Sequence, residues 1–432
     1  MDTLLLIPLD ERPINTAYPR LLAGALGWSL ESPPPETFGS RKVPADAEAI
    51  GAWLVERAAG GPLGAVVALD TLAWGGLVPS RQSGNDLAAA LARLETLARI
   101  RAEHPELKLM AYSSIQRVSR DNDDGEEPAY FKQLGSRIFR RSELEHRAHA
   151  GALEGDEAAE LETLRREVPE AVWNDQLAIR ERTLAVNLAA IDLVERGVID
   201  SLVLNQDDTT VWGINVMNRQ RLEREVRSRR LGERVFVYPG ADEVAQVLIA
   251  RLAAQVHGRR PLAGVIYSSR GGENVQTGYE DRPLGDLITV HLRAAGAVQA
   301  PGTVSPDWWL AVNSPSRSQG QGGLAYALEH GELDAAERAW IEKSEANVIG
   351  LNRSLESFHD ALEVLLASGA HLTVADVAYV NGGDDELLSA LAAAGTLELL
   401  AGYGGWNTAG NSLGSAVALG CIAALTGGPL PA

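Results

Sequence analysis

Cysteine is almost absent from this sequence, since Cys421 is the only one among 432 residues. An intrachain disulfide and a metal cluster held by cysteines are therefore both excluded. Cys421 lies in an apolar run at residues 415–425, where a free cysteine is typically a small buried hydrophobe. Hydrophobic residues make up 45% and charged residues 22% of the chain, so we expect an ordinary apolar core and no long disordered stretch.

Basic residues are in deficit, with 39 Lys and Arg against 58 Asp and Glu and a formal net charge of −19. A surface of this sign repels phosphate backbones and anionic lipids alike. We therefore predict no nucleic-acid partner and no membrane partner. A neutral small-molecule or oligosaccharide substrate, or a cation, suits this field better.

Long hydrophobic runs are missing as well. No stretch reaches the roughly 20 apolar residues that a membrane span needs. The first residues, MDTLLLIPLDERP, lack the basic start and the apolar length of a signal peptide. The sequence thus predicts a cytoplasmic protein.

Histidine is scarce where catalysis would need it, because none of the eight histidines lies in a polar loop after a predicted strand. His146 and His149 have the spacing of a metal-binding pair, but no third ligand is evident. We predict that both lie on the solvated face of a helix. Ser-His-Asp catalysis and a three-histidine zinc site both lack support.

Short apolar runs, each stopped by a polar loop, recur along the chain. This form is typical of buried parallel strands, and it predicts strands at residues 3–9, 65–69, 108–112, 201–204, 234–237, 264–267, 309–312, 374–380 and 399–403. Apolar residues at helical spacing predict helices at 44–59, 86–104, 179–196, 219–231, 243–256, 346–366 and 386–394. Strands that alternate with helices indicate an α/β protein with a parallel sheet and right-handed crossovers.

The number of strands favours a (β/α)-barrel-like fold, because nine candidates are close to the eight of a barrel. In this interpretation residues 1–312 form the catalytic region. Residues 313–432 either complete the sheet within one domain or form a second, C-terminal α/β lobe. The alternative is two smaller doubly wound domains, divided near residues 258–261 or in the loop 313–323. In every case ligands gather at the carboxyl ends of the strands.

Acidic residues follow the predicted strands and are the main catalytic candidates: Asp10, Glu11, Asp70, Asp207, Asp208, Asp242, Glu243 and Asp384. Asp207 and Asp208 carry the clearest signal, because like charges at a buried edge push their pKa values apart, as acid-base catalysis requires. A bland turn is the alternative there. For Asp242, Glu243 and Asp384 the alternative is helix capping, and for Asp10 and Glu11 it is an ion pair with Arg12.

Tryptophans and amides surround these acids and suit recognition of a neutral polyol such as a sugar. Five of the nine tryptophans lie in or near strand-end loops: Trp74, Trp212, Trp308, Trp309 and Trp406. The candidate catalytic residues are Asp207, Asp208, Asp242 and Glu243. The candidate substrate-binding residues are Asp10, Glu11, Arg12, Asp70, Trp74, Arg81, Gln206, Asn381, Asp384, Trp406, Asn407 and Asn411.

A glycine-rich stretch, GYGGWNTAGNSLG at residues 402–414, opens a predicted helix. It has neither the lysine of a P-loop nor the G-x-G-x-x-G spacing with a downstream acid. We interpret it as a place where the backbone approaches closely, which glycine permits.

The blocks LIPLDERPINT, LDTLAWGGLVPSR, LNQDDTTVWG, YPGADEV, VAYVNGGDDEL and GYGGWNTAGNSLG run in this order from residue 6 to residue 414. Together they resemble a bacterial family known only as a domain of unknown function, so the resemblance implies no activity. The tandem acids alone resemble those of the O-GlcNAcase-like β-N-acetylglucosaminidases, which are barrel enzymes. That second resemblance would make Asp207 the residue that orients the substrate's acetamido group and Asp208 the general acid/base.

Three functions remain open. The leading hypothesis is a carbohydrate-active hydrolase, most simply a glycosidase, which uses the strand-end carboxylates as acid and base and needs no cofactor. The second is an enzyme in which the same carboxylates hold Mg²⁺ or Mn²⁺, since hard cations prefer oxygen ligands. The third is a non-catalytic sugar-binding protein.

Overall fold

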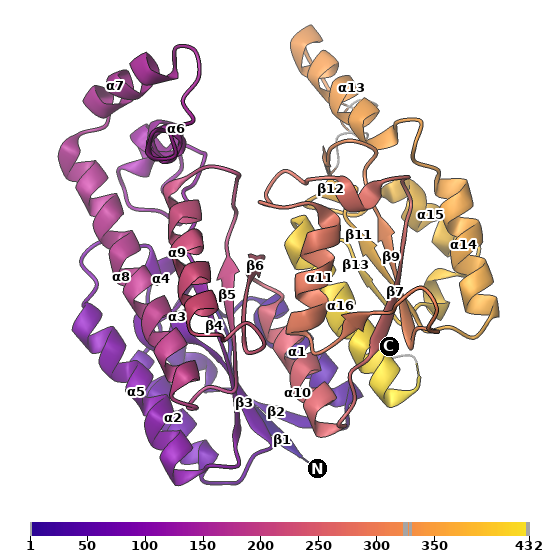
Figure 1. The fold of residues 1–432 in the computed structure, drawn as a ribbon, viewed down its shortest axis with the longest axis horizontal. Helices are drawn as coiled ribbons and strands as arrows, with labels where there is room; N and C mark the ends of the chain where they lie inside the picture. The colour runs from indigo at the N-terminus through magenta and orange to yellow at the C-terminus, as the bar shows by residue number, and fades with distance from the viewer. Residues whose placement is uncertain (1, 323–326, 328–330, 429–432) are drawn as a thin grey trace. The chain divides into compact units, whose positions relative to one another are not determined.

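The computed structural model describes residues 2–322, 327 and 331–428 and divides the chain into two compact units, Met1–Ala245 and Gln246–Ala432 (Figure 1). The predicted division between residues 312 and 313 falls inside the second unit, at the end of one of its strands. Each unit is built on its own sheet.

The first unit contains a six-stranded, wholly parallel sheet in the order β2-β1-β3-β4-β5-β6. Its strands are β1 (Thr3–Ile7), β2 (Ser29–Glu31), β3 (Gly64–Ala68), β4 (Lys108–Ile115), β5 (Ser201–Gln206) and β6 (Val235–Pro239). The chain leaves β1 for the edge strand β2 and then returns to β3 on the other side of β1. The winding direction therefore reverses between β1 and β3.

Five helices of the first unit pack on its sheet through alternate strand residues such as Leu5, Val67 and Leu202, which share a core with Ile50 and Ile191. They are α2 (Ala47–Ala58), α3 (Leu69–Trp74), α5 (Leu87–Glu103), α8 (Glu170–Glu195) and α9 (Ile214–Ser228). Helix α1 (Pro13–Ala25) contacts β2, and the short α4 (Leu77–Ser80) contacts α3. Between β4 and α8 the chain makes a helical excursion, α6 (Phe131–His149) and α7 (Glu157–Glu167), which has small apolar clusters of its own.

The second unit contains a five-stranded parallel sheet in the order β13-β11-β9-β7-β8. Its strands are β7 (Leu262–Tyr267), β8 (Val298–Gln299), β9 (Trp308–Asn313), β11 (Leu372–Asp376) and β13 (Gly402–Gly404), and a separate short ladder joins β10 (Gly320–Gln321) to β12 (Tyr379–Val380). The main helices are α10 (Val244–Val256), which begins just before the division, α11 (Leu284–Ala294), α13 (Ala335–Ile349), α14 (Leu355–Ala367), α15 (Asp385–Ala393) and α16 (Ala409–Thr426).

Both faces of the second sheet are covered by helices. Phe358 of α14 and Leu387 of α15 pack against Leu372 and Val374 of β11. Helix α16 packs against β9, β11 and β13. This helix is long and apolar enough to cross a membrane by length and composition alone, yet 89% of it is buried. It is a core helix of the second unit, and Cys421 within it is fully buried, as predicted.

The α/β class with parallel sheets is confirmed, and all nine predicted strands are present. The closure into a barrel is wrong, because within the described part of the chain the strands, apart from the short ladder of β10 and β12, form two open sheets with β2, β6, β8 and β13 at their edges. When the strands of each of these two sheets are numbered in chain order, both orders read 2-1-3-4-5, with a sixth strand added in the first unit. This doubly wound order is the predicted alternative. The predicted helix 346–366 is two helices, since α13 ends before Gly350 and α14 begins after Ser354.

Close packing inside the second unit yields a test. A Cβ atom at Gly420 would overlap the ring of the buried Trp308, so Gly420→Ala should lower the free energy of unfolding by about 1–3 kcal/mol. A Cβ atom at Gly24 in α1 would have no neighbouring atom within 4 Å, so Gly24→Ala should be neutral or stabilise by up to about 1 kcal/mol. Denaturant unfolding of both variants checks this, and equal effects would contradict the packing described.

Candidate active site at the carboxyl edge of the first sheet

Polar side chains follow five strands of the first sheet at the point where each strand ends. Asp10 follows β1, Asp70 follows β3, Gln116 follows β4, Asp207 follows β5 and Asp242 follows β6. All strands are parallel, so these residues share one edge. We call this set, together with the arginines and glutamates that contact it, the strand-end site. It includes the reversal between β1 and β3, where doubly wound sheets bind ligands.

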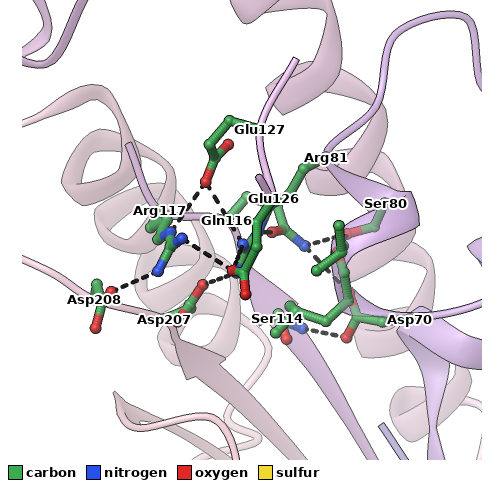
Figure 2. Close-up of polar contacts among 12 residues, drawn as sticks. Asp70, Ser80, Arg81, Ser114, Gln116, Arg117, Glu126, Glu127, Asp207 and Asp208 are labelled. Atoms are coloured by element: carbon green, nitrogen blue, oxygen red, sulfur yellow. Dashed lines mark hydrogen bonds and ion pairs between the residues drawn. The ribbon is translucent and has the colours of Figure 1, made fainter. Parts of the chain in front are cut away.

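Arg81 is the centre of the strand-end site and is only 2% exposed. Its Nε donates to Gln116 Oε1 at 3.1 Å, Nη1 donates to Glu126 Oε2 at 2.9 Å, and Nη2 donates to Asp207 (Figure 2). Arg81 follows α4, which the chain reaches through a turn at Gly75. A side chain at Gly75 would be strained, because its φ is 84° and a Cβ would lie 2.7 Å from Pro44 Cβ. The turn at Gly75 therefore allows Arg81 to lie at the strand ends.

Asp70 lies beneath Arg81 and is also buried. Its carboxylate accepts the Ser114 backbone N–H at 2.8 Å and Gln116 Nε2 at 3.3 Å. Burial raises the pKa of Asp70 to about 6, although the hydrogen bonds from Ser114 oppose this shift. Gln116 also donates to Ser80 Oγ at 2.6 Å, so Asp70 and Ser80 together orient the amide that supports Arg81.

A second arginine, Arg117, joins the acidic loop after β4 to the end of β5. Its Nε donates to Glu127 at 3.0 Å, Nη2 to Glu126 at 3.0 Å and Nη1 to Asp208 at 2.8 Å (Figure 2). The buried Arg180 of α8 donates to the Arg117 carbonyl oxygen at 2.6 Å, and burial lowers the pKa of Arg180 to about 10.

Sequence reasoning missed Arg117, Glu126, Glu127 and Arg180. The available signal was charge of both signs at residues 117–127, directly after a predicted strand. A glutamate pair in a loop is usually solvated, so this signal becomes specific only when the loop is seen to fold back on Arg81.

Asp207 and Asp208 are adjacent but have different surroundings. The Asp207 side chain is 11% exposed and pairs with Arg81, whereas the Asp208 side chain is 34% exposed and pairs with Arg117. Partial burial raises the pKa of Asp208, the charge of Asp207 raises it further, and Arg117 opposes both effects. Asp208 has a φ of 26°, a left-handed conformation that Asp tolerates better than most residues.

Arg12 joins the ends of β1 and β6. Its Nε donates to Asp10 at 2.9 Å, and its Nη1 donates to Asp242 Oδ2 at 3.1 Å. The ion pair between Asp10 and Arg12 is therefore present, and Asp242 shares the same guanidinium. Burial raises the pKa of Asp242 to about 6. This value includes the charges of Asp10 and Asp207, which also raise the pKa, and the charge and hydrogen bond of Arg12, which lower it.

The other candidates of the first unit lie outside this network. Glu11 is exposed, and Glu243 turns back to accept the Ala241 backbone N–H at 3.0 Å. Trp74 lines a separate surface cavity of about 500 Å³ at the starts of α2 and α5. Gln206 is buried and donates to Thr209 within its own loop.

The prediction for His146 is wrong. His149 is exposed, as expected, but His146 is only 3% exposed and its Nδ1 accepts the Gly213 backbone N–H at 3.1 Å. The charged composition of α6 concealed the fact that one of its faces packs against the start of α9.

The candidates of the second unit lie at the carboxyl edge of their own sheet. Asp384 caps α15, accepting the Glu386 N–H at 3.1 Å, and also pairs with Arg353. The fully buried Asp376, which the sequence did not single out, accepts Asn313 Nδ2 at 2.9 Å. Burial raises the pKa of Asp376 to about 6.

The glycine-rich segment of the second unit begins α16. The Gly410 N–H donates to Glu280 Oε1 at 2.7 Å, so a carboxylate of the chain itself occupies this helix end. A Cβ at Gly405 would lie 2.9 Å from Asp376 Cβ, which is the close backbone approach expected from the sequence. Asn407 and Asn411 both bond to Thr408, Trp406 is partly exposed, and Asn381 is exposed.

Metal coordination is not preformed at the strand-end site, because Asp10, Asp207, Asp208 and Asp242 each face a guanidinium group. Among the described residues, the one group of three potential ligands within 4.8 Å of one another is His359, Asp360 and Glu363 of α14. Asp360 and Glu363 are exposed there, and residues four apart on a helix meet without any ion.

The fold and the site define an α/β protein of two doubly wound units, the first of which carries a carboxylate and arginine network at its strand ends. The chain belongs to the family described as "Protein of unknown function (DUF4127)", whose model matches residues 4–428. The resemblance to a family of this kind is thereby confirmed. Comparisons with curated proteins and with solved structures gave no match.

The raised pKa of Asp70 predicts a pH dependence of stability. Its ordinary value is 3.8 and its folded value is about 6, so between these values the folded chain binds the additional proton. The contribution of Asp70 to stability is therefore present at low pH and is lost as the pH rises to about 6.

Asp70→Asn does not titrate, so its stability relative to the wild type should rise by roughly 1–3 kcal/mol between pH 4 and pH 7. Denaturant unfolding at several pH values measures this difference. Asp360→Asn, at an exposed position on α14, is the control, because it shows the effect on stability of removing an exposed carboxylate. If the difference in free energy of unfolding between Asp70→Asn and the wild type does not vary with pH, the raised pKa of Asp70 is contradicted.

Proposed function

We propose that this protein is a hydrolase that acts on a glycoside and uses the strand-end carboxylates of its first unit as acid and base. One observation carries the proposal. Two aspartates with raised pKa values, Asp208 and Asp242, follow the neighbouring strands β5 and β6. A carboxyl group with a raised pKa is what general acid catalysis of glycoside cleavage requires.

The unequal surroundings of the tandem acids support a division of roles. Asp208 is the more exposed of the two and therefore the more accessible to a substrate, so it is our candidate general acid/base. Asp207 is held by the buried Arg81 and would act by keeping the loop and the local charge in place. This favours direct acid-base hydrolysis over a scheme in which Asp207 binds an acetamido group.

Asp242 is the candidate for the second carboxylate, as base or nucleophile. Both of its oxygens accept from Arg12, whose side chain is 47% exposed and is therefore available to a substrate. At the strand-end site the acidic side chains outnumber the three cations, Arg12, Arg81 and Arg117. The excess of acid favours a neutral polyol over an anionic ligand.

A second candidate function, a Mg²⁺- or Mn²⁺-dependent enzyme, is favoured by two buried oxygens. Asn15 Oδ1 and Asn205 Oδ1 have no hydrogen-bond partner among the described residues. Both amides have a defined orientation, because the Asn15 amide nitrogen donates to Asp10 and that of Asn205 donates to the Gly240 carbonyl oxygen at 3.2 Å. Free acceptors of this kind suit either the hydroxyl groups of a sugar or a hard cation.

Asp208→Asn tests the leading proposal. Asn keeps the shape of the acid but cannot exchange a proton, so turnover of a responsive chromogenic glycoside should fall by about 10²-fold or more. The melting temperature should change little, since Asp208 is partly exposed. Asp192→Asn, at an exposed position of α8, is the control. Wild-type turnover combined with a lowered melting temperature would remove Asp208 from the mechanism.

Metal analysis separates the two candidate functions. Under the leading proposal, the protein purified in the presence of Mg²⁺ and Mn²⁺ should contain neither ion in stoichiometric amount, and a chelator should leave its turnover unchanged. Stoichiometric metal that Asn205→Leu removes, together with loss of turnover in the chelator, would establish the metal-dependent alternative.

A further inference from the structure

The loop at residues 207–213 carries Asp207 and Asp208 and ends at the first turn of α9. Gly213 is the N-cap residue of α9 and has no side chain that could cap the helix. The first N–H groups of a helix have no partner within the helix itself. At α9 these groups therefore need acceptors other than the side chain of the N-cap residue.

Helix α6 supplies the acceptors. The Gly213 N–H donates to His146 Nδ1 at 3.1 Å, and the Ile214 N–H donates to Ser142 Oγ at 2.8 Å. Ser142 and His146 are four residues apart on α6, so they share one face, and both are nearly fully buried. Because a backbone N–H only donates, His146 Nδ1 must be unprotonated, and the neutral ring carries its proton on Nε2.

The surroundings of the His146 ring favour its neutral form. Burial lowers the pKa of His146, and the electrostatic effects of His149 on α6 and Arg219 on α9 lower it further. The positive end of the α9 dipole acts in the same direction.

The loop approaches α6 closely and is held along its length. A Cβ at Gly213 would overlap Asn215 Oδ1 and lie 3.4 Å from Ser142 Oγ. The Trp212 ring meets the His146 ring edge-on, with centroids 4.9 Å apart. Further back, Thr210 Oγ1 donates to the Trp212 carbonyl oxygen. Asp208, with its left-handed φ, lies between these attachments and the end of β5.

We propose that His146 is a positioning residue, which together with Ser142 holds the start of α9 against α6 and thereby fixes the loop that presents Asp208 to the substrate. This inference rests on the role proposed above for Asp208. Helix α6 acts from a distance, because it supports the loop backbone and does not itself contact the reacting groups.

The chain offers matched variants for a test. His146→Leu removes the acceptor. His146→Asn retains one, because the Asn side-chain oxygen occupies the place of Nδ1. Ser142→Ala removes only the Ile214 contact, and His149→Leu changes the exposed histidine one turn further along the same helix. The measurement is amide hydrogen exchange of the full-length protein over residues 207–218, which requires no substrate.

His146→Leu and Ser142→Ala should speed exchange at the start of α9 by roughly five- to tenfold, while His146→Asn and His149→Leu should resemble the wild type. On a responsive glycoside, His146→Leu should lower kcat more than it raises KM, and His146→Asn should restore kcat. If His146→Leu does not fold, Ser142→Ala alone decides the exchange test.

Wild-type exchange in the variants that lose an acceptor would overturn the proposal. The proposal would also be overturned if exchange became faster in these variants but their kcat stayed unchanged, while Asp208→Asn alone abolished turnover. Faster exchange in a protein whose turnover survives Asp208→Asn would leave the capping by α6 established and reject the catalytic role of Asp208 instead.

Discussion

The burial of one guanidinium group is the constraint on which the candidate site depends. Arg81 is almost fully removed from water, and a buried charge is tolerated only when ion pairs and hydrogen bonds replace its hydration. The partners of Arg81 come from the residue directly after β4, the acidic loop that follows it and the end of β5. Because Arg81 must be neutralised, these segments are joined at one edge of the sheet, and their carboxylates are brought together there.

The winding of the two sheets explains why this edge is available. In each unit the chain reverses direction beside its first strand, which leaves the loops on the two sides of the reversal directed away from each other. In the first unit, the loops after β1 and β3 carry Asp10 and Asp70. The second unit repeats the strand order and has its own buried polar cluster around Asp376 and Arg353. The predicted substrate residues are thus divided between two sheet edges, one in each unit.

The proposed chemistry depends on the local structure of the segment after β5. Asp207 is drawn inward by Arg81 and Asp208 remains partly exposed beside Arg117, so two identical side chains acquire different surroundings. The difference persists only if the backbone between β5 and α9 keeps its conformation. Gly213 permits the close approach to α6, and Ser142 and His146 supply the hydrogen bonds. A helical excursion from the sheet thereby contributes to a site that it does not enter.

The sequence by itself determined the positions of the helices and principal strands, because apolar periodicity and the polarity of strand ends are set by residues close together in the sequence. It placed all nine principal strands and identified the acids that follow them, although β2 and β8, of three and two residues, are too short for a periodic signal. Only the tertiary structure decided that the strands form two open sheets, since periodicity does not encode the side on which a crossover returns. It also decided which acids meet an arginine. Glu127 and Arg180 reach the site from segments far from Arg81 in the sequence. His146 became a buried acceptor only through the packing of α6 against α9, where it contacts Gly213, 67 positions away in the chain.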